Sequence, residues 1–501
     1  MLLLGIDVGT SSIKVAAVDA QSQKRIASVQ YPDTETEIKS LKTGWAEQSP
    51  EEWWTNVQKA ILKLNATNLF NPTEVKAIGI SYQMHGLVVV DKNQKVLRDS
   101  IIWCDSRAVE IGNKAFDAIG HEKSLQHLLN SPGNFTASKL AWVKQSEPEI
   151  YEQIDKVMLP GDFIAMKLTG EITTSISALS EGIFWDFKND ELSADLLNYY
   201  GIARSLIPEI KPLFSIHGLL KTEVAKFLGL NAEIPISYKS GDQPNNALSL
   251  NVLKPGEVAA TAGTSGVIYG VSESAVYDPQ SRINSFAHIT YAPASKHTGV
   301  LLCINGTGSM YRWAKHNFAP SLSYNDINKL SQSSPIGSNG LKVLPFGNGA
   351  ERMLNNKYTG AQLTSVDLNL HNQADIFRAV QEGIACSFRY GLDIMREIGM
   401  KPSIIRAGKA NLFLSEVFAQ IFVDVTGVPV ELFENDGSVG AALGAGIGSG
   451  IYKTYQEAFT NQEKIALLEP KNSNKYEIVY NEWNNLLSKE LTKYDDKSSN
   501  R

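Results

Sequence analysis

The chain has 501 residues, of which 43% are hydrophobic and 20% are charged, which is ordinary for a globular protein. Its 47 basic and 53 acidic residues give a net charge of −6, which argues against a nucleic-acid-binding protein, because such a protein would carry a basic patch. A single hydrophobic core rarely grows beyond about 250–300 residues, so the length predicts two large domains.

The cysteines and the apolar runs narrow the class of protein further. Cys104, Cys303 and Cys386 lie far apart and form no CxxC pair. This spacing favours neither a disulfide framework nor a zinc site, and is typical of a reducing compartment. The opening run Met1–Leu4 has no basic leader and Asp7 soon interrupts it, which favours a first strand over a signal peptide. We expect a cytoplasmic protein that binds neither membranes nor nucleic acids.

The first third of the chain alternates predicted strands with predicted helices. Ser49 can cap a helix that begins with Pro50 and two acidic residues, so a helix is predicted over 51–64. Strands are expected where β-branched and apolar residues alternate between turn residues. The expected strands are 2–7, 13–18, 75–81, 87–90 and 101–103, and residues 137–170 are expected to be largely helical.

A second alternation begins near the middle of the chain. The expected strands are 234–238, 257–262, 267–271 and 403–406, and the expected helices are 246–253, 373–398, 412–426 and 439–450. The tail from residue 493 to residue 501 is charged and polar, and we expect it to be disordered.

One short motif occurs twice in the same setting. Gly9-Thr10-Ser11 and Gly263-Thr264-Ser265 each join two predicted strands, about half the chain apart. Two domains of one plan would produce this repeat. Backbone N–H groups and hydroxyls of such turns can bind phosphate, and glycine lets the backbone approach it closely. One such turn alone is more simply an ordinary hairpin, whereas the two together favour a triphosphate site.

Two aspartates stand beside these turns. Asp7 ends the first predicted strand, and a carboxylate next to bound phosphate requires a cation, so it is a candidate for holding Mg²⁺ through water. Asp242 follows Gly241 at another strand end and is a candidate base for accepting the proton of an attacking hydroxyl. The alternatives, a turn-capping Asp7 and a helix-capping Asp242, stay open at this point.

Polar and aromatic residues end two other predicted strands. Gln83, Met84 and His85 follow one strand, and Trp103 and Asp105 follow the next. Ligands of α/β proteins bind at the carboxyl ends of strands, so these residues could form a pocket for a polyhydroxylated ligand. Taken singly, His85 is more often a structural histidine and Trp103 more often a core residue.

Several well-known motifs are absent from the sequence or fail in their context. Gly444-Ala445-Gly446 does not follow a strand within a βαβ unit, which excludes a dinucleotide-binding loop. The sequence contains no GxxxxGK[ST], HExxH or GxSxG motif, so a P-loop kinase, a zinc protease and an α/β-hydrolase are unsupported.

Taken together and in this order, the motifs resemble the FGGY family of carbohydrate kinases over roughly residues 3–449. The resemblance rests on the following segments: 5–11 (GIDVGTS), 45–54 (WAEQSPEEWW), 83–86 (QMHG), 102–107 (IWCDSR), 241–243 (GDQ) and 261–266 (TAGTSG). Within the family, the 83–86 segment is similar to the substrate motif of members that act on xylulose.

The resemblance implies an α/β fold of two ribonuclease-H-like domains, as in the actin, Hsp70 and sugar-kinase superfamily, with ATP and sugar in a cleft between them. It implies ATP-dependent phosphorylation of a ketopentose, D-xylulose in the first place, with Mg²⁺ as cofactor. We expect an N-terminal domain over 1–246 and a C-terminal domain over 247–492. The sequence leaves a homodimer open.

The resemblance also implies a role for each candidate residue. Asp242 is the general base, and Asp7 is a second catalytic residue that positions Mg²⁺. The substrate-binding residues are Met84, His85, Trp103, Asp105 and Asp242. The nucleotide-binding residues are Gly9, Thr10, Ser11, Lys14, Gly263, Thr264, Ser265, Gly408, Lys409 and Asn411.

Two departures from the family pattern leave alternatives open. The segment 406–411 (RAGKAN) replaces a Gly-Gly-Gly-Ala-type run at the adenosine site, and Lys409 could instead lie beside the α-phosphate. Gln243 stands where xylulose-specific members often have Asn and glycerol kinases often have Gln. A kinase of ribulose, glycerol or gluconate, or a non-catalytic sugar- or nucleotide-binding protein of actin-like fold, is therefore kept as an alternative.

Overall fold

The computed structural model describes residues 1–499, with side chains described through residue 494, and divides into two compact units. Unit 1 comprises residues 1–253, 286–298 and 435–462, and unit 2 comprises residues 254–285, 299–434 and 463 onward. The main boundary lies seven residues after the predicted one at 246/247. The prediction did not include the two later segments that return to unit 1.

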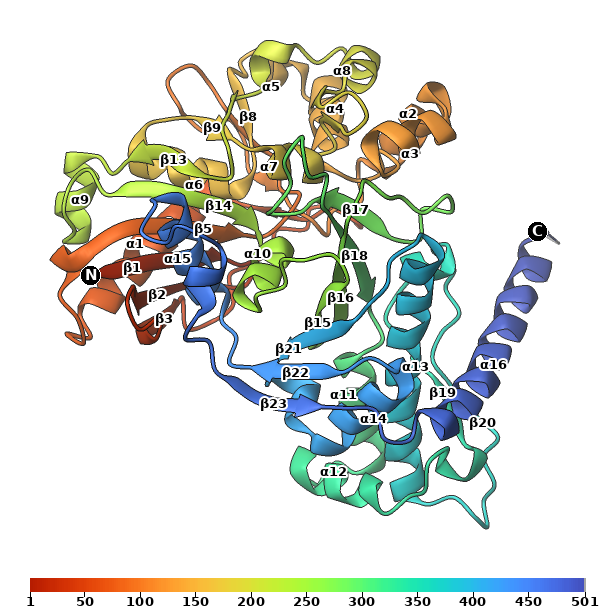
Figure 1. The fold of residues 1–501 in the computed structure, drawn as a ribbon. Helices are drawn as coiled ribbons and strands as arrows, with labels where there is room; N and C mark the ends of the chain where they lie inside the picture. The colour runs from red at the N-terminus through yellow and green to blue at the C-terminus, as the bar shows by residue number, and fades with distance from the viewer. Residues whose placement is uncertain (500–501) are drawn as a thin grey trace. The chain divides into compact units, whose positions relative to one another are not determined.

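Unit 1 is built on a six-stranded mixed sheet in the order β13-β14-β5-β1-β2-β3 (Figure 1). β1 pairs in parallel with β5 and β5 with β14, whereas β2 is antiparallel to β1 and β13 is antiparallel to β14. The strands of this sheet are β1 (Leu2–Val8), β2 (Ile13–Asp19), β3 (Arg25–Tyr31), β5 (Val75–Tyr82), β13 (Phe214–Leu219) and β14 (Pro235–Gly241).

Helices and short strand pairs surround this sheet. The helices are α1 (Pro50–Asn65), α2 (Val109–Ile119), α3 (His121–Leu128), α4 (Thr136–Ser146), α5 (Pro148–Tyr151), α6 (Pro160–Thr169), α7 (Ile176–Glu181), α8 (Ala194–Tyr200), α9 (Thr222–Leu228), α10 (Asp242–Ser249) and α15 (Gly437–Gly448). The short strands are β4 (Glu47–Gln48), β6 (Val88–Val90), β7 (Ser100–Ile101), β8 (Lys156–Met158), β9 (Thr173–Thr174), β10 (Trp185–Asp186), β11 (Glu191–Leu192) and β12 (Glu209–Ile210).

Helix α1 forms for the reasons visible in the sequence. The Ser49 hydroxyl accepts the Glu52 N–H at 3.4 Å, and Pro50 occupies the first turn, where a missing N–H costs nothing. Trp53, Val57, Ile61 and Leu64 recur at helical spacing and are buried in one core with β1 and β5.

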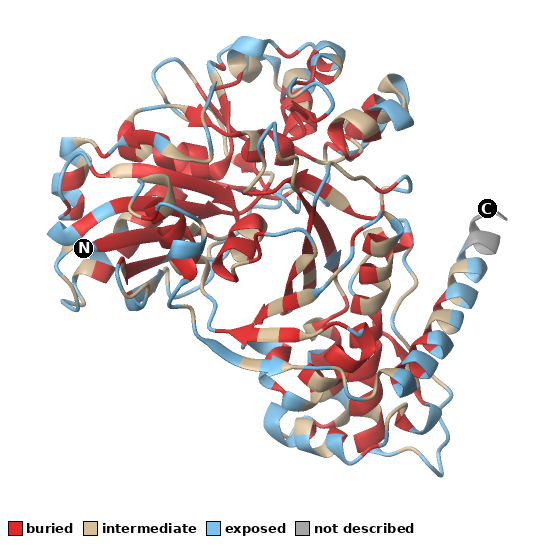
Figure 2. Ribbon diagram, in the orientation of Figure 1, coloured by how far each residue is buried: buried red, intermediate tan, exposed pale blue. Residues whose placement is uncertain are grey.

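Helix α15 lies unusually close to the sheet of unit 1. A Cβ on Gly5 of β1 would lie 1.7 Å from the Ser438 carbonyl oxygen, and one on Gly79 of β5 would lie 1.9 Å from that of Ala441. A Cβ on Gly448 of the helix would lie 1.8 Å from the Ser237 carbonyl oxygen. Glycines on both surfaces thus allow backbone to meet backbone, which explains why the glycine-rich segment forms a buried helix (Figure 2).

Unit 2 repeats the plan of unit 1. Its sheet has seven strands in the order β17-β18-β16-β15-β21-β22-β23. β15 is antiparallel to β16 and parallel to β21, β21 is parallel to β22, and β22 is antiparallel to β23. These pairings match those of β1 with β2 and β5, of β5 with β14, and of β14 with β13. The expected two-domain α/β fold is confirmed, and the two Gly-Thr-Ser turns occupy equivalent hairpins.

Five elements of unit 2 lie close to predicted ones, at 257–262, 266–272, 404–408, 373–397 and 416–426, and its remaining strands and helices were not predicted. The strands are β15 (Glu257–Ala262), β16 (Gly266–Ser272), β17 (Asn284–Ala287), β18 (Thr298–Ile304), β19 (Lys342–Leu344), β20 (Gln362–Thr364), β21 (Ile404–Gly408), β22 (Val430–Phe433) and β23 (Lys464–Leu468). The helices are α11 (Gly308–Phe318), α12 (Tyr324–Gln332), α13 (Gln373–Glu397), α14 (Glu416–Thr426) and α16 (Ser473–Ser499).

Several predicted boundaries differ from the structure, two of them for a clear reason or over a long stretch. Helix α10 begins at Asp242 rather than at residue 246, because Pro244 falls in its first turn, where proline is tolerated. Residues 493–499 were expected to be disordered, but they continue α16, whose earlier turns bury Tyr476 and Trp483. Residues 500 and 501 lie outside the described part of the chain.

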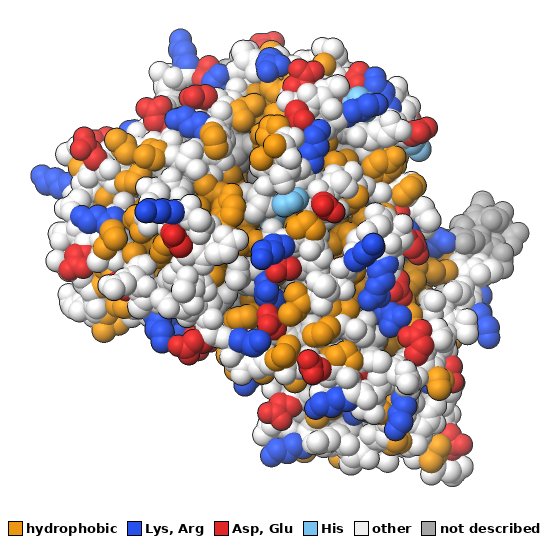
Figure 3. All heavy atoms as spheres, viewed as in Figure 1, with side chains coloured by type: hydrophobic (Ala, Val, Ile, Leu, Met, Phe, Trp, Pro, Cys, Tyr) orange, Lys and Arg blue, Asp and Glu red, His pale blue; other side chains and the backbone are white. Residues whose placement is uncertain are grey.

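The surface bears out the mixed composition. On the face shown in Figure 3, Lys and Arg side chains are interspersed with Asp and Glu. Among the described residues, no helix combines the length and the apolar character needed to cross a bilayer.

Candidate functional site

Three parallel strands of unit 1 end at the same edge of the sheet. β5 is the middle strand, with Ser81 in register with Asp7 of β1 on one side and with Ser240 of β14 on the other. The segment 83–85 continues directly from the end of β5, and Asp242 follows the end of β14. The topology therefore explains why residues from distant parts of the sequence gather where α/β proteins bind ligands.

Asp242 is the first residue of α10, and Gly241 occupies the N-cap position. The alternative in which Asp242 is the N-cap residue is therefore wrong. Burial and the negative charge of Asp7 raise the pKa of Asp242 to about 7. A carboxyl group with such a pKa is well matched to accepting a proton near neutral pH.

Asp7 lies against the first turn of α15. A Cβ on Gly437, the first residue of that helix, would lie 2.6 Å from Asp7 Oδ2, so the carboxylate occupies the space that this glycine leaves. Burial raises the pKa of Asp7, and the charge of Asp436 adds to this rise, whereas the Ser81 hydroxyl and Lys14 oppose it. Lys14 faces Asp7 across the β1–β2 ladder and is itself exposed.

Met84 and His85 form one side of the site. The backbone of His85 has a φ of +64°, a left-handed conformation that is uncommon outside glycine. Its ring Nδ1 lies 2.9 Å from the backbone carbonyl oxygen of Glu181, and the ring packs edge-on against Phe135 at a centroid distance of 4.9 Å. Met84 is buried, and a Cβ on Gly241 would lie 2.6 Å from its Cγ. Met84, which is predicted to bind the sugar, therefore lies against Gly241, the residue that precedes Asp242.

The indole of Trp103 is held by one hydrogen bond, and about half of the side chain is exposed to solvent. Its Nε1–H donates to the Thr10 hydroxyl at 3.0 Å, and the side chain is 53% exposed. Thr10 donates in turn to Gln83 Oε1 at 3.3 Å, and Gln83 donates to Gln48 Oε1 at 3.0 Å. Trp103 is therefore not a core residue, and the Thr10 hydroxyl connects the first Gly-Thr-Ser turn to the two predicted sugar segments.

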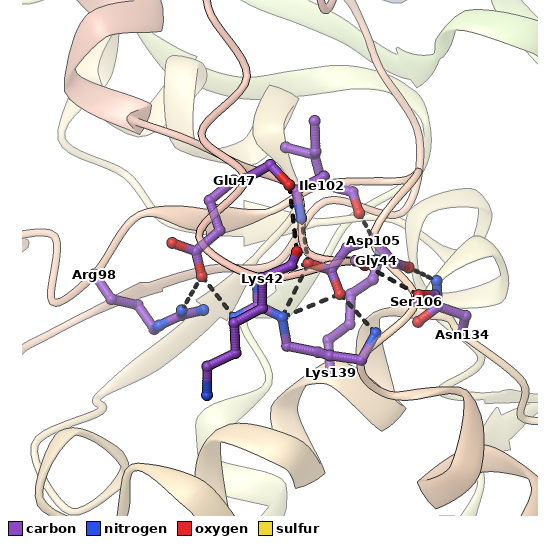
Figure 4. A network of polar contacts seen from close by, with 12 residues as sticks. Lys42, Gly44, Glu47, Arg98, Ile102, Asp105, Ser106, Asn134 and Lys139 are labelled. Carbon is purple, nitrogen blue, oxygen red and sulfur yellow. Dashed lines mark hydrogen bonds and ion pairs between the residues drawn. The ribbon is translucent and has the colours of Figure 1, made fainter.

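Asp105 has a different environment from the one expected of a residue that contacts a sugar. Its carboxylate is buried, accepts the Ala46 N–H at 2.6 Å, and forms an ion pair with Arg107 at 2.6 Å. Arg107 also pairs with Glu47, and the Asn134 amide donates to the Asp105 carbonyl oxygen (Figure 4). Because these contacts engage both carboxylate oxygens, the structure indicates a positioning role for Asp105 behind Trp103.

Lys139 of α4 contacts both segments that are predicted to bind the sugar, 83–86 and 102–107. Its side chain is fully buried, and Nζ donates to the His85 carbonyl oxygen at 2.8 Å. It also donates to the Ile102 carbonyl oxygen at 3.0 Å (Figure 4). Burial lowers the pKa of Lys139 to about 7. The sequence offered no signal for this residue, because nothing in the sequence distinguishes a buried lysine of a helix from a solvent-exposed one.

In unit 2, the second Gly-Thr-Ser turn meets the beginning of α11. The carbonyl oxygens of Gly263 and Thr264 accept the N–H groups of Gly308 and Ser309 at 2.9 and 3.0 Å. A Cβ on Gly308 would lie 2.4 Å from the Gly263 oxygen, so glycine is required there. Within the described residues, the N–H groups of Thr264 and Ser265 donate to no protein acceptor, which leaves them available to an anion.

A cavity of about 310 Å³ opens beside this turn within unit 2. It is lined by thirteen residues: Ala262, Gly263, Thr264, Gly308, Ser309, Tyr311, Arg312, Tyr324, Asn328, Asn411, Leu412, Leu414 and Ser415. Its size and its mixed lining suit a small organic ligand such as a nucleoside.

The nucleotide residues expected from the sequence only partly line this cavity. Gly263, Thr264 and Asn411 do, whereas Ser265, Gly408 and Lys409 are not among its lining residues. Lys409 is exposed, and its N–H donates to the Phe433 carbonyl oxygen at 2.8 Å.

Residues of α11 and α12 that the sequence analysis missed supply the aromatic and amide groups of the cavity. The rings of Tyr311 and Tyr324 stack at a centroid distance of 5.9 Å. The Tyr311 hydroxyl donates to Asn328 Oδ1 at 2.5 Å, and Gln381 Nε2 donates to the Tyr311 hydroxyl oxygen at 3.1 Å. No motif marks these residues, because their spacing is that of ordinary amphipathic helices.

The acidic residues suit a metal ion that keeps most of its own water. Among the described residues, no group of three or more His, Cys, Asp or Glu side chains could enclose a metal. Asp7 and Asp242 nevertheless act on each other electrostatically, since the charge of Asp7 raises the pKa of Asp242. Mg²⁺ is commonly held by one or two carboxylates together with water and substrate phosphates, so this pair fits it.

Comparison with known proteins connects this arrangement to enzymes of known activity. A model of the N-terminal domain of the FGGY family of carbohydrate kinases matches residues 2–249, and a model of the C-terminal domain of that family matches residues 258–449. The chain is 31% identical to the xylulose kinase of Staphylococcus epidermidis, over 98% of this chain and 99% of that protein.

Solved structures resemble the fold over nearly its full length. The xylulose kinase of Rhodospirillum rubrum superposes with a TM-score of 0.89 at 25% identity, covering 99% of this chain and 100% of that one. The gluconate kinase of Lactobacillus acidophilus superposes with a TM-score of 0.88 at 22% identity, covering 99% of each chain. The second likeness concerns the fold alone, so the fold is compatible with more than one sugar.

Proposed function

This chain belongs to the FGGY family of carbohydrate kinases, which transfer phosphate from ATP to a sugar, and we propose that its sugar is D-xylulose, phosphorylated at O5. The observation that carries the choice is the segment 83–86 at the end of β5. It brings Met84 against Gly241, next to the candidate base, and the His85 ring lies against the Glu181 carbonyl oxygen. The match to a xylulose kinase along the whole chain supports the same choice.

In the proposed mechanism, the carboxylate of Asp242 takes the proton of the sugar's terminal hydroxyl. The hydroxyl oxygen forms a bond to the γ-phosphorus while the bond from that phosphorus to the β,γ-bridging oxygen breaks, and ADP leaves. The raised pKa of Asp242, about 7, suits this role, because it lets the group gain and lose a proton near neutral pH. His85 and Trp103 orient the sugar, with the exposed indole face as one wall.

Each Gly-Thr-Ser turn, taken within its own unit, is proposed as a phosphate-binding turn. Adenosine would occupy the cavity of unit 2 lined by Tyr311, Tyr324 and Asn328. The N–H groups of Thr10 and Thr264, which donate to no protein acceptor in the described chain, would contact the phosphates. Asp7 would hold Mg²⁺ through water, and the bound ion would offset the negative charge of the triphosphate. A role for Lys409 beside the α-phosphate lacks support, because this residue is exposed and outside the cavity lining.

The substrate is tested with a panel of D-xylulose, D-ribulose, gluconate and glycerol, by following ADP release. D-Xylulose should show the highest kcat/KM, and Asp242→Ala should abolish turnover of every substrate. A protein that phosphorylates gluconate or glycerol but neither ketopentose would contradict the choice of sugar. Gln243, which stands where glycerol kinases often have the same residue, is the feature that favours this second outcome.

A cytoplasmic location and a homodimer remain predictions. Sedimentation of the purified protein would measure the oligomeric state directly.

A further inference from the structure

Glu181, the last residue of α7, is a buried acid at the candidate sugar site that the sequence analysis did not single out. Its side chain is 1% exposed. The helix that carries it is capped by Ser175, whose hydroxyl accepts the Ala178 N–H at 3.2 Å, so the position of Glu181 is well defined. A buried carboxyl group that belongs to no ion pair in the described chain requires an explanation.

The hydrogen-bonding capacity of this carboxyl group is largely unused. Oε1 accepts only the His85 N–H, at a long 3.4 Å. No donor of the described chain reaches Oε2 within hydrogen-bonding distance. Oε2 does not belong to the fully buried side-chain atoms that lack a partner, so it keeps a small accessible surface. A ligand that reaches this surface would supply the missing partners.

The surroundings of Glu181 indicate which ligand this would be. Oε2 lies where a Cβ on Gly241 would be only 2.5 Å away, and the same Cβ would be 2.6 Å from Met84 Cγ. The carboxyl group is therefore enclosed by Met84, by the backbone that leads into Asp242, and by the N–H of His85. These three are the parts of unit 1 to which the sugar and its reacting hydroxyl are assigned above.

We propose that Glu181 is a substrate-binding residue whose carboxyl group hydrogen-bonds a non-reacting hydroxyl of the sugar and so contributes to the choice of substrate. The inference rests on the proposed function for the site, but not on which sugar occupies it. Burial, followed by the charges of Asp242 and Asp162, raises the pKa of Glu181 and so favours its protonated form. A protonated carboxyl group can donate through one oxygen and accept through the other, which matches a hydroxyl.

The test combines changes at Glu181 with changes in the sugar. Wild type, Glu181→Gln and Glu181→Met are assayed with D-xylulose and with its 1-deoxy, 3-deoxy and 4-deoxy analogues. Gln keeps both hydrogen-bonding functions at nearly the same size, whereas Met keeps only the size. We expect wild type and Glu181→Gln to lose about 10- to 100-fold in kcat/KM with one of the analogues. In Glu181→Met that analogue and D-xylulose should react within about threefold of each other.

A merely structural role would give a different pattern. If Glu181 only supports the fold around His85, Glu181→Met will lower kcat/KM for all four sugars by the same factor, and the proposal is overturned. Thermal unfolding of each variant identifies loss of fold. Glu351→Met serves as the matched control, since Glu351 is another buried acid, located in unit 2, that accepts the Asn305 N–H at 3.0 Å. Its discrimination among the analogues should equal that of wild type.

Failure of the choice of sugar and failure of this inference can be told apart. If wild type prefers another substrate of the panel, such as gluconate, the cycle is repeated with deoxy analogues of that substrate. If Glu181→Met then lowers kcat/KM for that substrate but not for one of its deoxy analogues, the inference is retained while D-xylulose is discarded. Uniform loss with the preferred substrate would reject the inference while the kinase activity stands.

Discussion

At the scale of single residues, the site depends on what burial does to carboxyl groups. Asp7, Asp242 and Glu181 all have raised pKa values, and burial is the largest cause for each. The roles proposed for them differ because their neighbours differ. Asp242 lies at a helix N-terminus beside a second acid, whereas Glu181 lies beside a thioether and a backbone N–H.

Replacing Asp242 by Asn should remove the proton acceptor without changing the shape of the site. We expect kcat to fall about 10²- to 10⁴-fold while the KM for ATP and for the sugar changes little. In wild type, kcat/KM should rise with pH and level off above about 7, because only the deprotonated group accepts a proton. Steady-state kinetics between pH 5.5 and 8.5 measure both effects. A pH-independent rate in wild type would contradict the role of Asp242.

The same residue should lower the stability of the fold. The pKa of Asp242 is raised on folding, so the native protein binds more protons than the unfolded one between about pH 4 and 7, and stability falls as pH rises through this window. Asp242→Asn should therefore raise Tm at pH 8 by about 2–4 °C and leave it nearly unchanged at pH 4. Thermal unfolding followed by circular dichroism at the two pH values gives the comparison. An equal gain at both would mean that the charge is not the cause.

Sequence reasoning located residues at strand ends more reliably than residues that reach the site from helices. Asp7, His85 and Asp242 could be predicted because each directly follows an apolar strand, and parallel strands end at a common edge. Glu181 and Lys139 could not, because each reaches the site from a helix whose packing against the β5 segment is settled only by the folded chain. The role of Asp105 stays a prediction, and its position after a strand does not reveal that Arg107 engages its carboxylate.

At the scale of secondary-structure elements, helix α4 connects the two predicted sugar segments through a single lysine. Lys139→Met would remove one of the donors to each carbonyl oxygen, since Ile102 O would keep the Asp105 N–H at 3.2 Å and His85 O would keep the Thr136 hydroxyl at 3.2 Å. We expect a stability loss of about 1–3 kcal/mol in urea unfolding. The kcat/KM for the sugar should fall about 10- to 100-fold through misplacement of both segments, with the KM for ATP unchanged.

A second lysine on the same helix provides the control for this change. Lys144 Nζ donates to the Tyr200 carbonyl oxygen at 3.0 Å and makes no contact with either sugar segment. Lys144→Met should leave the kinetics for the sugar unaltered. Equal kinetic effects of the two changes would show that α4 acts through general stability and not through Lys139.

The contact between α15 and the sheet of unit 1 gives another prediction at this scale. Gly79→Ala places a Cβ 1.9 Å from the Ala441 carbonyl oxygen, so the helix must move. The expected cost is about 1–3 kcal/mol or more in urea unfolding. Gly399→Ala is the comparison, because its Cβ meets open space and only its φ of +94° is unfavourable. A smaller loss for Gly79→Ala than for Gly399→Ala would contradict the close packing.

At the scale of the whole molecule, two units of one plan are proposed to bind different ligands. The equivalent hairpins of β1–β2 and β15–β16 keep the same Gly-Thr-Ser turn. In unit 1, the strand ends near the first turn carry Asp7, Asp242 and the residues that are proposed to bind the sugar. In unit 2, the turn opens onto a cavity that is lined by aromatic and amide side chains. The duplication was predictable from the repeated turn. The assignment of the Gly-rich segment 437–448 to unit 1 was not, since a run of small residues can form a loop or a close-packed helix.

This division of ligands predicts that the two affinities can be changed separately. Tyr324→Ala removes an aromatic face from the cavity of unit 2, and stacking of a base on such a face is worth about 1–3 kcal/mol, or about 5- to 150-fold in Kd. ADP binding measured by calorimetry should weaken by that factor, while D-xylulose binding is unchanged. His85→Ala should do the reverse, because its ring lies within unit 1 against Phe135 and the Glu181 carbonyl oxygen. If Tyr324→Ala weakens the sugar and leaves ADP unaffected, the adenosine site is assigned to the wrong cavity, whereas the assignment of the sugar fails if His85→Ala weakens only ADP.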